Sequence, residues 1–188
     1  MDPLICVACG ERGDAPVVEG TVVGGSVLRC ARCGHRQPFR RLPMFSLTGP
    51  SGTGKSTVCR LLAAELGEHV VVLEQDVLWT AGLQDPADDY RAFRRTWLRM
   101  VAMIHQSGRP VLLCGTVVPA QFEACPERAL IGDIHYLALT CDPGELRARL
   151  LARPAWRGWD EARVAEMLEF DAWLRGAAPA LGVPLLDT

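Results

Sequence analysis

The clearest chemical signal in this chain is a glycine-rich loop suited to holding phosphate groups. The stretch GPSGTGKST, residues 49–57, matches the pattern G-x-x-x-x-G-K-[ST] in full. Its glycines let backbone amides turn toward a triphosphate, Lys55 can reach the β- and γ-phosphates, and the Ser56 hydroxyl is a ligand for Mg²⁺. The predicted nucleotide-binding residues are Gly49, Pro50, Ser51, Gly52, Thr53, Gly54, Lys55, Ser56 and Thr57. The loop therefore predicts a protein that binds ATP together with Mg²⁺.

Two CxxC pairs near the N-terminus form a second chemical cluster. CVACG (residues 6–10) and CARCGH (residues 30–35) place four thiols at the spacing of a four-thiolate zinc site. The predicted ligands are Cys6, Cys9, Cys30 and Cys33. A redox-active CxxC pair or two local disulfides are the alternatives. The other four cysteines stand singly in apolar segments and are expected to be buried free thiols.

A pair of acids follows the apolar run after the phosphate loop. In VVVLEQDVLW, Glu74 and Asp76 are two residues apart, so on an extended chain they project to one side while Gln75 faces the other. Motor and switch ATPases carry an acid at the end of another apolar strand, but PVLLCG (residues 110–115) contains none. The acid pair therefore indicates a polar site beside the phosphates, in a protein that is neither a motor nor a switch ATPase.

Alternating strands and helices must position these residues. We expect strands at residues 44–48, 69–74, 110–114, 133–140 and 183–187, with one helix directly after the loop and others near 86–106, 142–152 and 160–175. Five short apolar runs separated by helices predict an α/β fold with a five-stranded parallel sheet covered on both faces. In such a sheet the phosphate loop lies at the carboxyl edge, where ligands bind.

Length and composition limit the classes of protein. The chain has 188 residues, of which 49% are apolar, and a formal net charge of -2, which fits one globular domain with a small appendage. This charge gives no general reason to expect nucleic acid. No apolar run reaches the roughly 18 residues of a membrane span, and the first residues lack the pattern of a signal peptide. We therefore expect a cytoplasmic protein with no membrane partner.

The first forty residues resemble a zinc ribbon. The resemblance rests on the two CxxCG turns and on the short Val-rich runs of a hairpin between them. It implies a structural Zn²⁺ held by the four cysteines, with His35 outside the ligand set. Nucleic acid is a possible but not favoured partner of the basic side chains in this region, which are Arg29, Arg32, Arg36, Arg40 and Arg41.

The remaining chain resembles the small-molecule kinases of the nucleoside, nucleotide and gluconate type, which have the nucleoside-monophosphate-kinase fold. The resemblance rests on the phosphate loop, on Asp76 followed by Trp79, and on LTCDPGELRARLLARPAWRGWD (residues 139–160). It implies that Asp76 acts as base or orienter for an acceptor hydroxyl, and that the arginines of the second stretch begin a lid over the nucleotide. A helix cap at Asp76 and a solvated arginine face are the plainer alternatives. The predicted catalytic residues are Lys55, Asp76, Arg149 and Arg153, with Arg157 in the same stretch.

An acceptor pocket is expected between Asp76 and the helix near residues 86–106. The apolar side chains at helical spacing in this helix belong to the core, whereas its arginines either hold a substrate or form a solvated face. Thr116 is a candidate because it follows the third strand. The predicted substrate residues are Glu74, Trp79, Arg91, Arg94 and Thr116, and Glu74 is also a candidate to support Mg²⁺.

These signals together predict an ATP- and Mg²⁺-dependent phosphotransferase that moves the γ-phosphate to a hydroxyl of a small molecule, such as a nucleoside, a sugar or another metabolite. We expect residues 1–40 to form the zinc ribbon and residues 43–188 to form a P-loop kinase domain with its lid near 147–160. The alternatives are a polynucleotide end kinase whose ribbon holds nucleic acid, and a nucleotide-sensing regulator that transfers nothing. ATP, Mg²⁺ and a structural Zn²⁺ are the expected cofactors.

Overall fold

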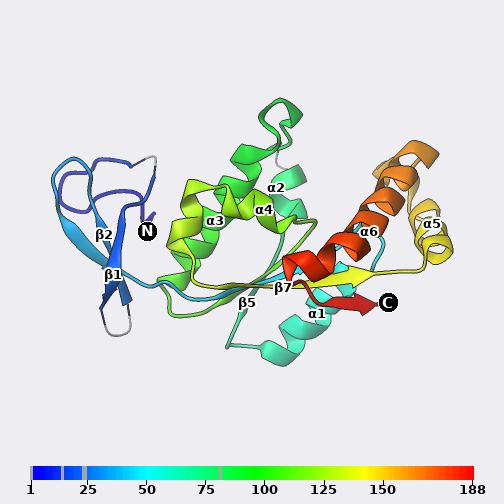
Figure 1. Ribbon diagram of the computed structural model, residues 1–188, viewed down its shortest axis with the longest axis horizontal. Helices are drawn as coiled ribbons and strands as arrows, with labels where there is room; N and C mark the ends of the chain where they lie inside the picture. The colour runs from blue at the N-terminus through cyan, green and yellow to red at the C-terminus, as the bar shows by residue number, and fades with distance from the viewer. Residues whose placement is uncertain (1, 14, 23–24, 81) are drawn as a thin grey trace.

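A five-stranded parallel sheet lies at the centre of the molecule (Figure 1). The computed structural model describes residues 2–13, 15–22, 25–80 and 82–188. The strands of this sheet follow the order β5-β6-β4-β7-β8. Their bounds are β4 (Met44–Thr48), β5 (Val71–Glu74), β6 (Val111–Cys114), β7 (Ile134–Thr140) and β8 (Leu185–Asp187). Since all neighbouring strands are parallel, their carboxyl ends meet at one edge, and the phosphate loop after β4 lies there.

Helices cover both faces of this sheet (Figure 1). The helix that follows the phosphate loop packs on Leu47 and Leu139 from one face, whereas Met44 and Leu113 meet the opposite layer of helices. Side chains alternate along each strand, which is why a single strand such as β4 serves both layers. The helices are α1 (Lys55–Leu66), α2 (Asp76–Thr80), α3 (Arg91–His105), α4 (Pro119–Glu123), α5 (Pro143–Leu151) and α6 (Glu161–Leu181).

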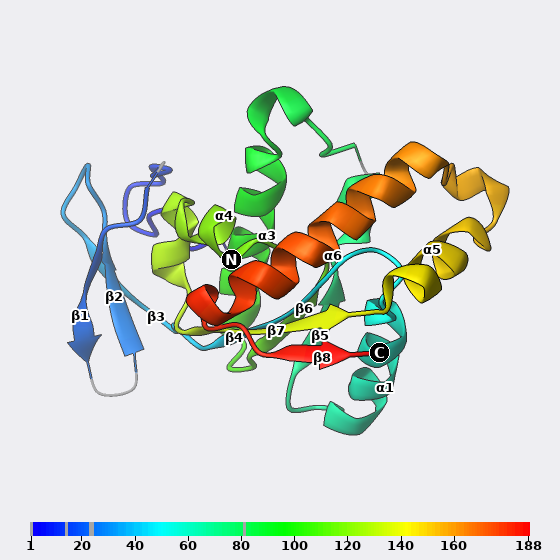
Figure 2. The ribbon, with the colours of Figure 1, turned by 45° about the vertical axis from the view of Figure 1, so that its right-hand side comes forward.

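A small antiparallel sheet is formed by the N-terminal segment, in the order β1-β2-β3. Its strands are β1 (Val18–Val22), β2 (Gly25–Arg29) and β3 (Arg36–Phe39). Leu4, Leu28 and Phe39 share one apolar core with α3, and the Gln106 side chain bonds both the amide and the carbonyl of Arg40. Figures 1 and 2 show this small sheet at one end of the molecule and the helices α5 and α6 toward the other.

The predicted fold class is confirmed, and the five predicted strands match the observed ones to within two residues. The helix expected near residues 86–106 is shorter, because Asp89 and Tyr90 adopt positive φ angles and α3 begins only at Arg91. Before it stands a single 3₁₀ turn, η1 (Pro86–Asp88). The short helices α2 and α4 were not predicted, because five residues carry too little periodicity to be recognised.

Within the described parts of the chain, no helix combines the length and the apolar character needed to cross a membrane.

Candidate active site

The phosphate loop has a backbone that only glycine accommodates at its key positions. Gly49 has a φ of 134°, and a Cβ there would lie 2.2 Å from the carbonyl oxygen of Leu139. Gly52 and Gly54 also have positive φ angles, of 97° and 84°. Helix α1 begins at Lys55, so the loop leads straight into a helix N-terminus, where amides and helix dipole favour an anion.

Lys55 lies inside this loop. Its ammonium donates to the carbonyl oxygens of Gly49 and Pro50, both at 2.7 Å. Burial lowers the pKa of Lys55 to about 8, with Arg153 adding to the shift and the charges of Asp76 and Glu74 opposing it. A bound triphosphate would favour the charged ammonium, so ligand binding and protonation of this side chain are coupled.

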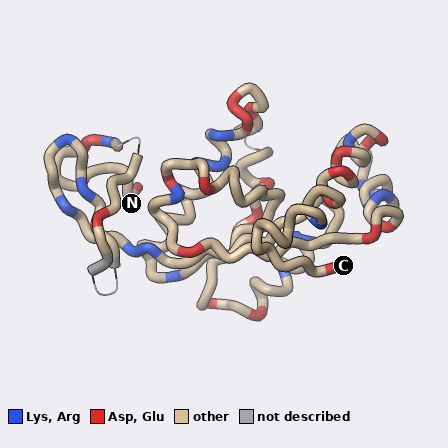
Figure 3. Tube along the Cα trace, in the orientation of Figure 1, with Lys and Arg blue, Asp and Glu red and all other residues tan. Residues whose placement is uncertain are grey.

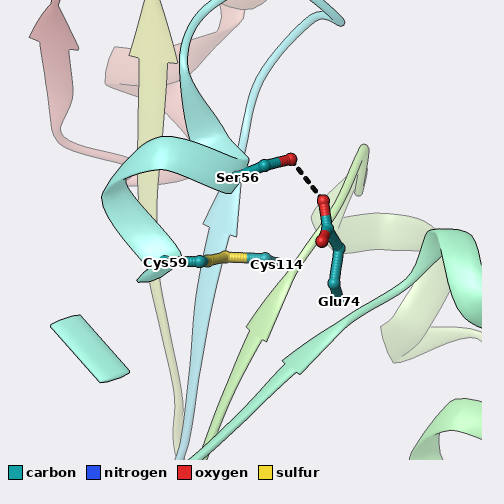
Figure 4. Close-up of a disulfide and its surroundings, with 4 residues drawn as sticks. All are labelled: Ser56, Cys59, Glu74 and Cys114. Carbon is teal, nitrogen blue, oxygen red and sulfur yellow. Dashed lines mark hydrogen bonds between the residues drawn. A yellow bond between two sulfur atoms is a disulfide. The ribbon is translucent and has the colours of Figure 1, made fainter. Parts of the chain in front are cut away.

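Glu74 and Asp76 face one cavity from the ends of two adjoining elements. Glu74 is the last residue of β5 and Asp76 is the first residue of α2, and both line the cavity that also contains Lys55. Gln75 faces the other way and is only 3% exposed, with its side chain against Gly115. The Ser56 hydroxyl donates to the Glu74 carboxylate, as Figure 4 shows. The acid pair is thus beside the phosphate loop, as its spacing predicts.

Three arginines of the segment at residues 147–160, called here the arginine segment, line the same cavity. They are Arg149, Arg153 and Arg157. The guanidinium of Arg153 lies over the ring of Trp159 at 5.3 Å from its centroid. Burial and the nearby Arg157 lower the pKa of Arg153, whereas the charge of Asp76 raises it. Asp76 therefore interacts electrostatically with two cations of the cavity, Lys55 of the phosphate loop and Arg153 of the arginine segment.

The cavity formed by these groups has a volume of about 390 Å³. Two acids, one lysine and three arginines line it, which suits a polyanion bound next to a carboxylate. The lining residues are Ser51, Gly52, Gly54, Lys55, Ser56, Thr57, Glu74, Asp76, Cys114, Gly115, Thr116, Arg149, Arg153 and Arg157.

The remaining predicted nucleotide-binding residues support the loop from outside the cavity lining. Gly49 and Pro50 supply the carbonyls that hold Lys55. Thr53 is fully buried, and its hydroxyl donates to the Pro50 carbonyl at 2.9 Å. Thr116, a predicted substrate residue, lines the cavity and donates to the Gly49 carbonyl at 3.2 Å.

Three predicted substrate residues do not reach the cavity. Trp79 packs on the rings of Tyr90 and Phe93, at 5.1 and 5.6 Å between centroids. Arg94 is buried and donates to Asp89 at 2.9 Å, whereas Arg91 is exposed beside Asp88. The helical spacing correctly placed Arg91 and Arg94 on α3, but their pairing with Asp88 and Asp89 just before this helix could not be foreseen.

A disulfide between α1 and β6 departs from the expectation that Cys59 and Cys114 are single buried thiols. Cys59 lies one turn beyond Ser56 on α1, and Cys114 ends β6 next to the cavity (Figure 4). The two cysteines are 55 residues apart in sequence, and only the packing of α1 across β6 brings them together. Cys125 and Cys141 are buried free thiols, as expected.

The four predicted zinc ligands converge at the other end of the molecule. Their sulfur atoms all lie within 4.8 Å of one another, with Cys6 and Cys33 at 3.7 Å and Cys9 and Cys30 at 3.8 Å. A tetrahedron with zinc–sulfur bonds of about 2.3 Å has sulfur–sulfur edges of about 3.8 Å, so the cluster fits a four-thiolate zinc site. Gly10 and Gly34 end the two CxxCG turns with nearly equal positive φ angles of 70° and 73°.

Comparisons with known proteins agree with this geometry. A family model described as "AAA domain" matches residues 46–169. The bifunctional pantoate ligase/cytidylate kinase of Synechococcus sp. (strain RCC307) is 47% identical over 53 residues, which are 24% of this chain and 10% of that protein. The chain thus spans about a tenth of this curated relative.

Solved kinases have a similar fold. A gluconokinase from Sinorhizobium meliloti 1021 is 21% identical and superposes with a TM-score of 0.50, over 79% of this chain and 84% of its own. The APS kinase of Mycobacterium tuberculosis, solved in complex with AMPPNP and APS, is 23% identical with a TM-score of 0.50, over 67% of this chain and 76% of its own. Because the matching family model covers about two thirds of the sequence, the chain belongs to the AAA domain family, and its fold is that of P-loop small-molecule kinases.

Proposed function

We propose that this protein is an ATP- and Mg²⁺-dependent phosphotransferase that moves the γ-phosphate to a hydroxyl of a small molecule, such as a nucleoside, a sugar or another metabolite. The observation that carries the proposal is the meeting of Lys55, Asp76 and Arg153 in one cavity. Phosphoryl transfer needs cations around the transferring group and a carboxylate beside the acceptor, and little other chemistry from the protein.

Each wall of the cavity has a role in this proposal. The loop amides and Lys55 bind the β- and γ-phosphates, and the arginine segment acts as a lid that neutralises the transferring group. Ser56 and Glu74 would hold Mg²⁺, which supplies further neutralisation of the phosphates. Asp76 accepts the proton of the acceptor hydroxyl while that oxygen bonds to the γ-phosphorus and the bond to the β–γ bridging oxygen breaks.

The N-terminal segment has a structural role in the proposal. Residues 1–40 form a ribbon around Zn²⁺, and residues 43–188 form the kinase domain with its lid near 147–160. Thiolate ligands need a reducing compartment, which supports a cytoplasmic location.

A screen of acceptors tests the proposed function. ADP release would be followed with nucleosides, sugars, amine-bearing sugars and 5′-hydroxyl oligonucleotides, each against the rate without acceptor. We expect at least one small molecule to raise turnover, and Asp76→Asn to lower kcat by about 10²–10³ while leaving ATP binding intact. Asp133→Asn is a matched control, since Asp133 is an exposed acid before β7. Wild-type turnover by Asp76→Asn on the best acceptor would contradict the role of Asp76.

The polynucleotide end kinase has less support because three of the five arginines in this region have acidic partners. Arg29 and Arg36 both pair with Glu19, and Arg32 pairs with Glu11. A nucleic-acid backbone would have to displace these carboxylates, so the ribbon is a poor phosphate-binding surface. If a 5′-hydroxyl oligonucleotide outperformed every small molecule in the same screen, this ranking of the alternatives would be wrong.

A further inference from the structure

The two walls of the cavity carry charges of opposite sign. Its four cations, Lys55, Arg149, Arg153 and Arg157, all come from the phosphate loop and the arginine segment. The wall formed by the ends of β5 and β6 contributes Glu74 and Asp76, and among its described lining residues there is no lysine or arginine. The cations thus surround the place of the triphosphate, whereas the acceptor side is acidic.

The arginines of α3, the other source of positive charge near this wall, already have acidic partners. Arg95 meets both carboxylate oxygens of the fully buried Glu127, at 2.9 and 3.0 Å. Arg94 is held by Asp89, and Arg99 pairs with Asp2 of the N-terminal segment. If Arg95 left Glu127 to bind a substrate, the buried Glu127 carboxylate would lose the charge that compensates it. These arginines are therefore poor candidates to bind an anionic acceptor.

The segment that begins at this wall is rich in acids, two of which pair with arginines of α3: Asp88 with Arg91 and Asp89 with Arg94. Residues 74–90 include five acids and no lysine or arginine, and three of the acids, Asp85, Asp88 and Asp89, lie in the loop that leads to α3. Figure 3 shows this loop as a protrusion with acidic residues at its tip. Trp79 packs against Tyr90 and so ties α2 to the end of the same loop. The carboxylates of this wall thus lie beside an acceptor next to Asp76, whereas the arginines of α3 are held in ion pairs.

We propose that the acceptor is a neutral or positively charged hydroxyl compound, and that the acidic wall discriminates against acceptors carrying a phosphate, sulfate or carboxylate group. This inference rests on the proposed phosphotransfer and narrows its substrate class. Like charges placed together across a binding site oppose binding strongly, and they select against wrong partners more than they strengthen the right one.

Matched pairs of acceptors that differ by one anionic group test the proposal. Suitable pairs are a nucleoside and its 5′-monophosphate with a free 3′-hydroxyl, and an aldose and its aldonate, with an amine-bearing sugar as the cationic probe. For pairs with turnover, we expect kcat/KM to be at least about tenfold higher for the neutral member, equivalent to about 1.4 kcal/mol. The ratio should fall as salt rises, because exposed charges are screened.

Two substitutions locate the source of the discrimination. In the double variant Asp85→Asn/Asp88→Asn, the asparagine side chains can still accept the hydrogen bonds from the backbone N–H groups of Ala87 and Ala92. The two negative charges, however, are removed. We expect the double variant to lower the kcat/KM ratio of neutral over anionic acceptor by about threefold. Glu68→Gln is the control, because Glu68 is an exposed acid after α1 and its loss should leave this ratio unchanged.

The outcomes separate the two proposals. A preference for the anionic member, or an equal rate for both, would overturn the charge proposal and leave phosphotransfer standing. If the kcat/KM ratio of neutral over anionic acceptor were unchanged in Asp85→Asn/Asp88→Asn, these two residues would have no role in the discrimination. Turnover with no member of any pair would overturn the charge proposal together with the proposed function.

Discussion

Arginine is used differently at the two ends of the parallel sheet. At the carboxyl end, Arg153 and Arg157 lie against indole rings and line a cavity. At the amino end, Arg29, Arg32 and Arg99 each meet a carboxylate, and the ribbon packs through an apolar core. The two clusters look alike in sequence. Arg149 combines both uses, because it lines the cavity and also pairs with Glu145 at 3.2 Å.

Removing zinc should affect one end of the molecule alone. Cys9→Ser breaks a four-thiolate cluster, and the loss of metal-coupled folding should cost several kcal/mol of unfolding free energy. We expect one zinc per chain by metal analysis, lost in Cys9→Ser, with ATP binding by calorimetry retained.

His35→Ala is the matched control for this prediction. His35 follows the second CxxCG turn, is exposed and lies outside the sulfur cluster, so its loss should leave the zinc content unchanged. If Cys9→Ser abolished ATP binding as well, the two ends would be coupled and the comparison between them would fail.

Trp159 should matter for rate through Arg153. Its ring contacts the guanidinium groups of Arg153, at 5.3 Å, and Arg163, at 4.6 Å, so it positions a cation that lines the cavity. Trp159→Ala should lower kcat about tenfold with little change in the KM for ATP, since cation–π contacts of this kind are worth about 0.5–2 kcal/mol. Trp159→Phe should restore part of the rate. Equal rates for the two variants would mean that Trp159 has only a structural role.

The pH dependence of ATP binding should report Lys55. Its pKa of about 8 lies below the ordinary value of 10.5, so the free protein loses this charge as the pH rises through 8. ATP affinity should therefore fall by about tenfold between pH 7 and 9, because the bound triphosphate favours the protonated side chain.

The stability of the free protein should respond in the opposite sense. Between pH 8 and 10.5 the unfolded chain binds this proton more tightly than the folded one, so the Lys55 contribution to stability rises with pH. Lys55→Met should bind ATP weakly and without this pH dependence in calorimetry. If the ATP affinity of the wild-type protein stayed constant between pH 7 and 9, Lys55 would not change its protonation state in this range.

The smallest effect is expected from the ribbon arginines. Arg32 pairs with Glu11 on the exposed surface, where such a pair contributes about 0–1 kcal/mol. Arg32→Ala should change neither acceptor turnover nor its salt dependence by more than about twofold. A steep loss of oligonucleotide binding in this variant would favour the polynucleotide alternative.

Local patterns in the sequence were enough to predict the P-loop kinase fold, and this prediction is confirmed. The phosphate loop, the Glu74–Asp76 spacing and the two CxxC pairs are each determined by a few neighbouring residues, and the structure brings the members of each together. Their predicted roles stay predictions.

Contacts between distant segments could not be predicted. The sequence showed arginines on α3 but not that Arg95 lies beside Glu127, which is 32 residues further along the chain. The stacking of Arg153 on Trp159 had a faint signal in the tryptophan-rich turn, whereas the bond between Cys59 and Cys114 had none. The residue pattern of one helix or strand predicts on which face of that element a side chain lies. Which residue the side chain contacts depends on how the elements pack.

The Cys59–Cys114 bond turns residues 59–114 into a covalent ring. The ring contains β5, α2 and α3, and with them Glu74 and Asp76, while Lys55 and Ser56 precede it and Gly115 and Thr116 follow it. In the chain-entropy model, closing a loop of this length removes about 4 kcal/mol of freedom from the unfolded chain. The two acids beside the acceptor thus belong to a segment whose ends are joined covalently at the helix that begins with Lys55.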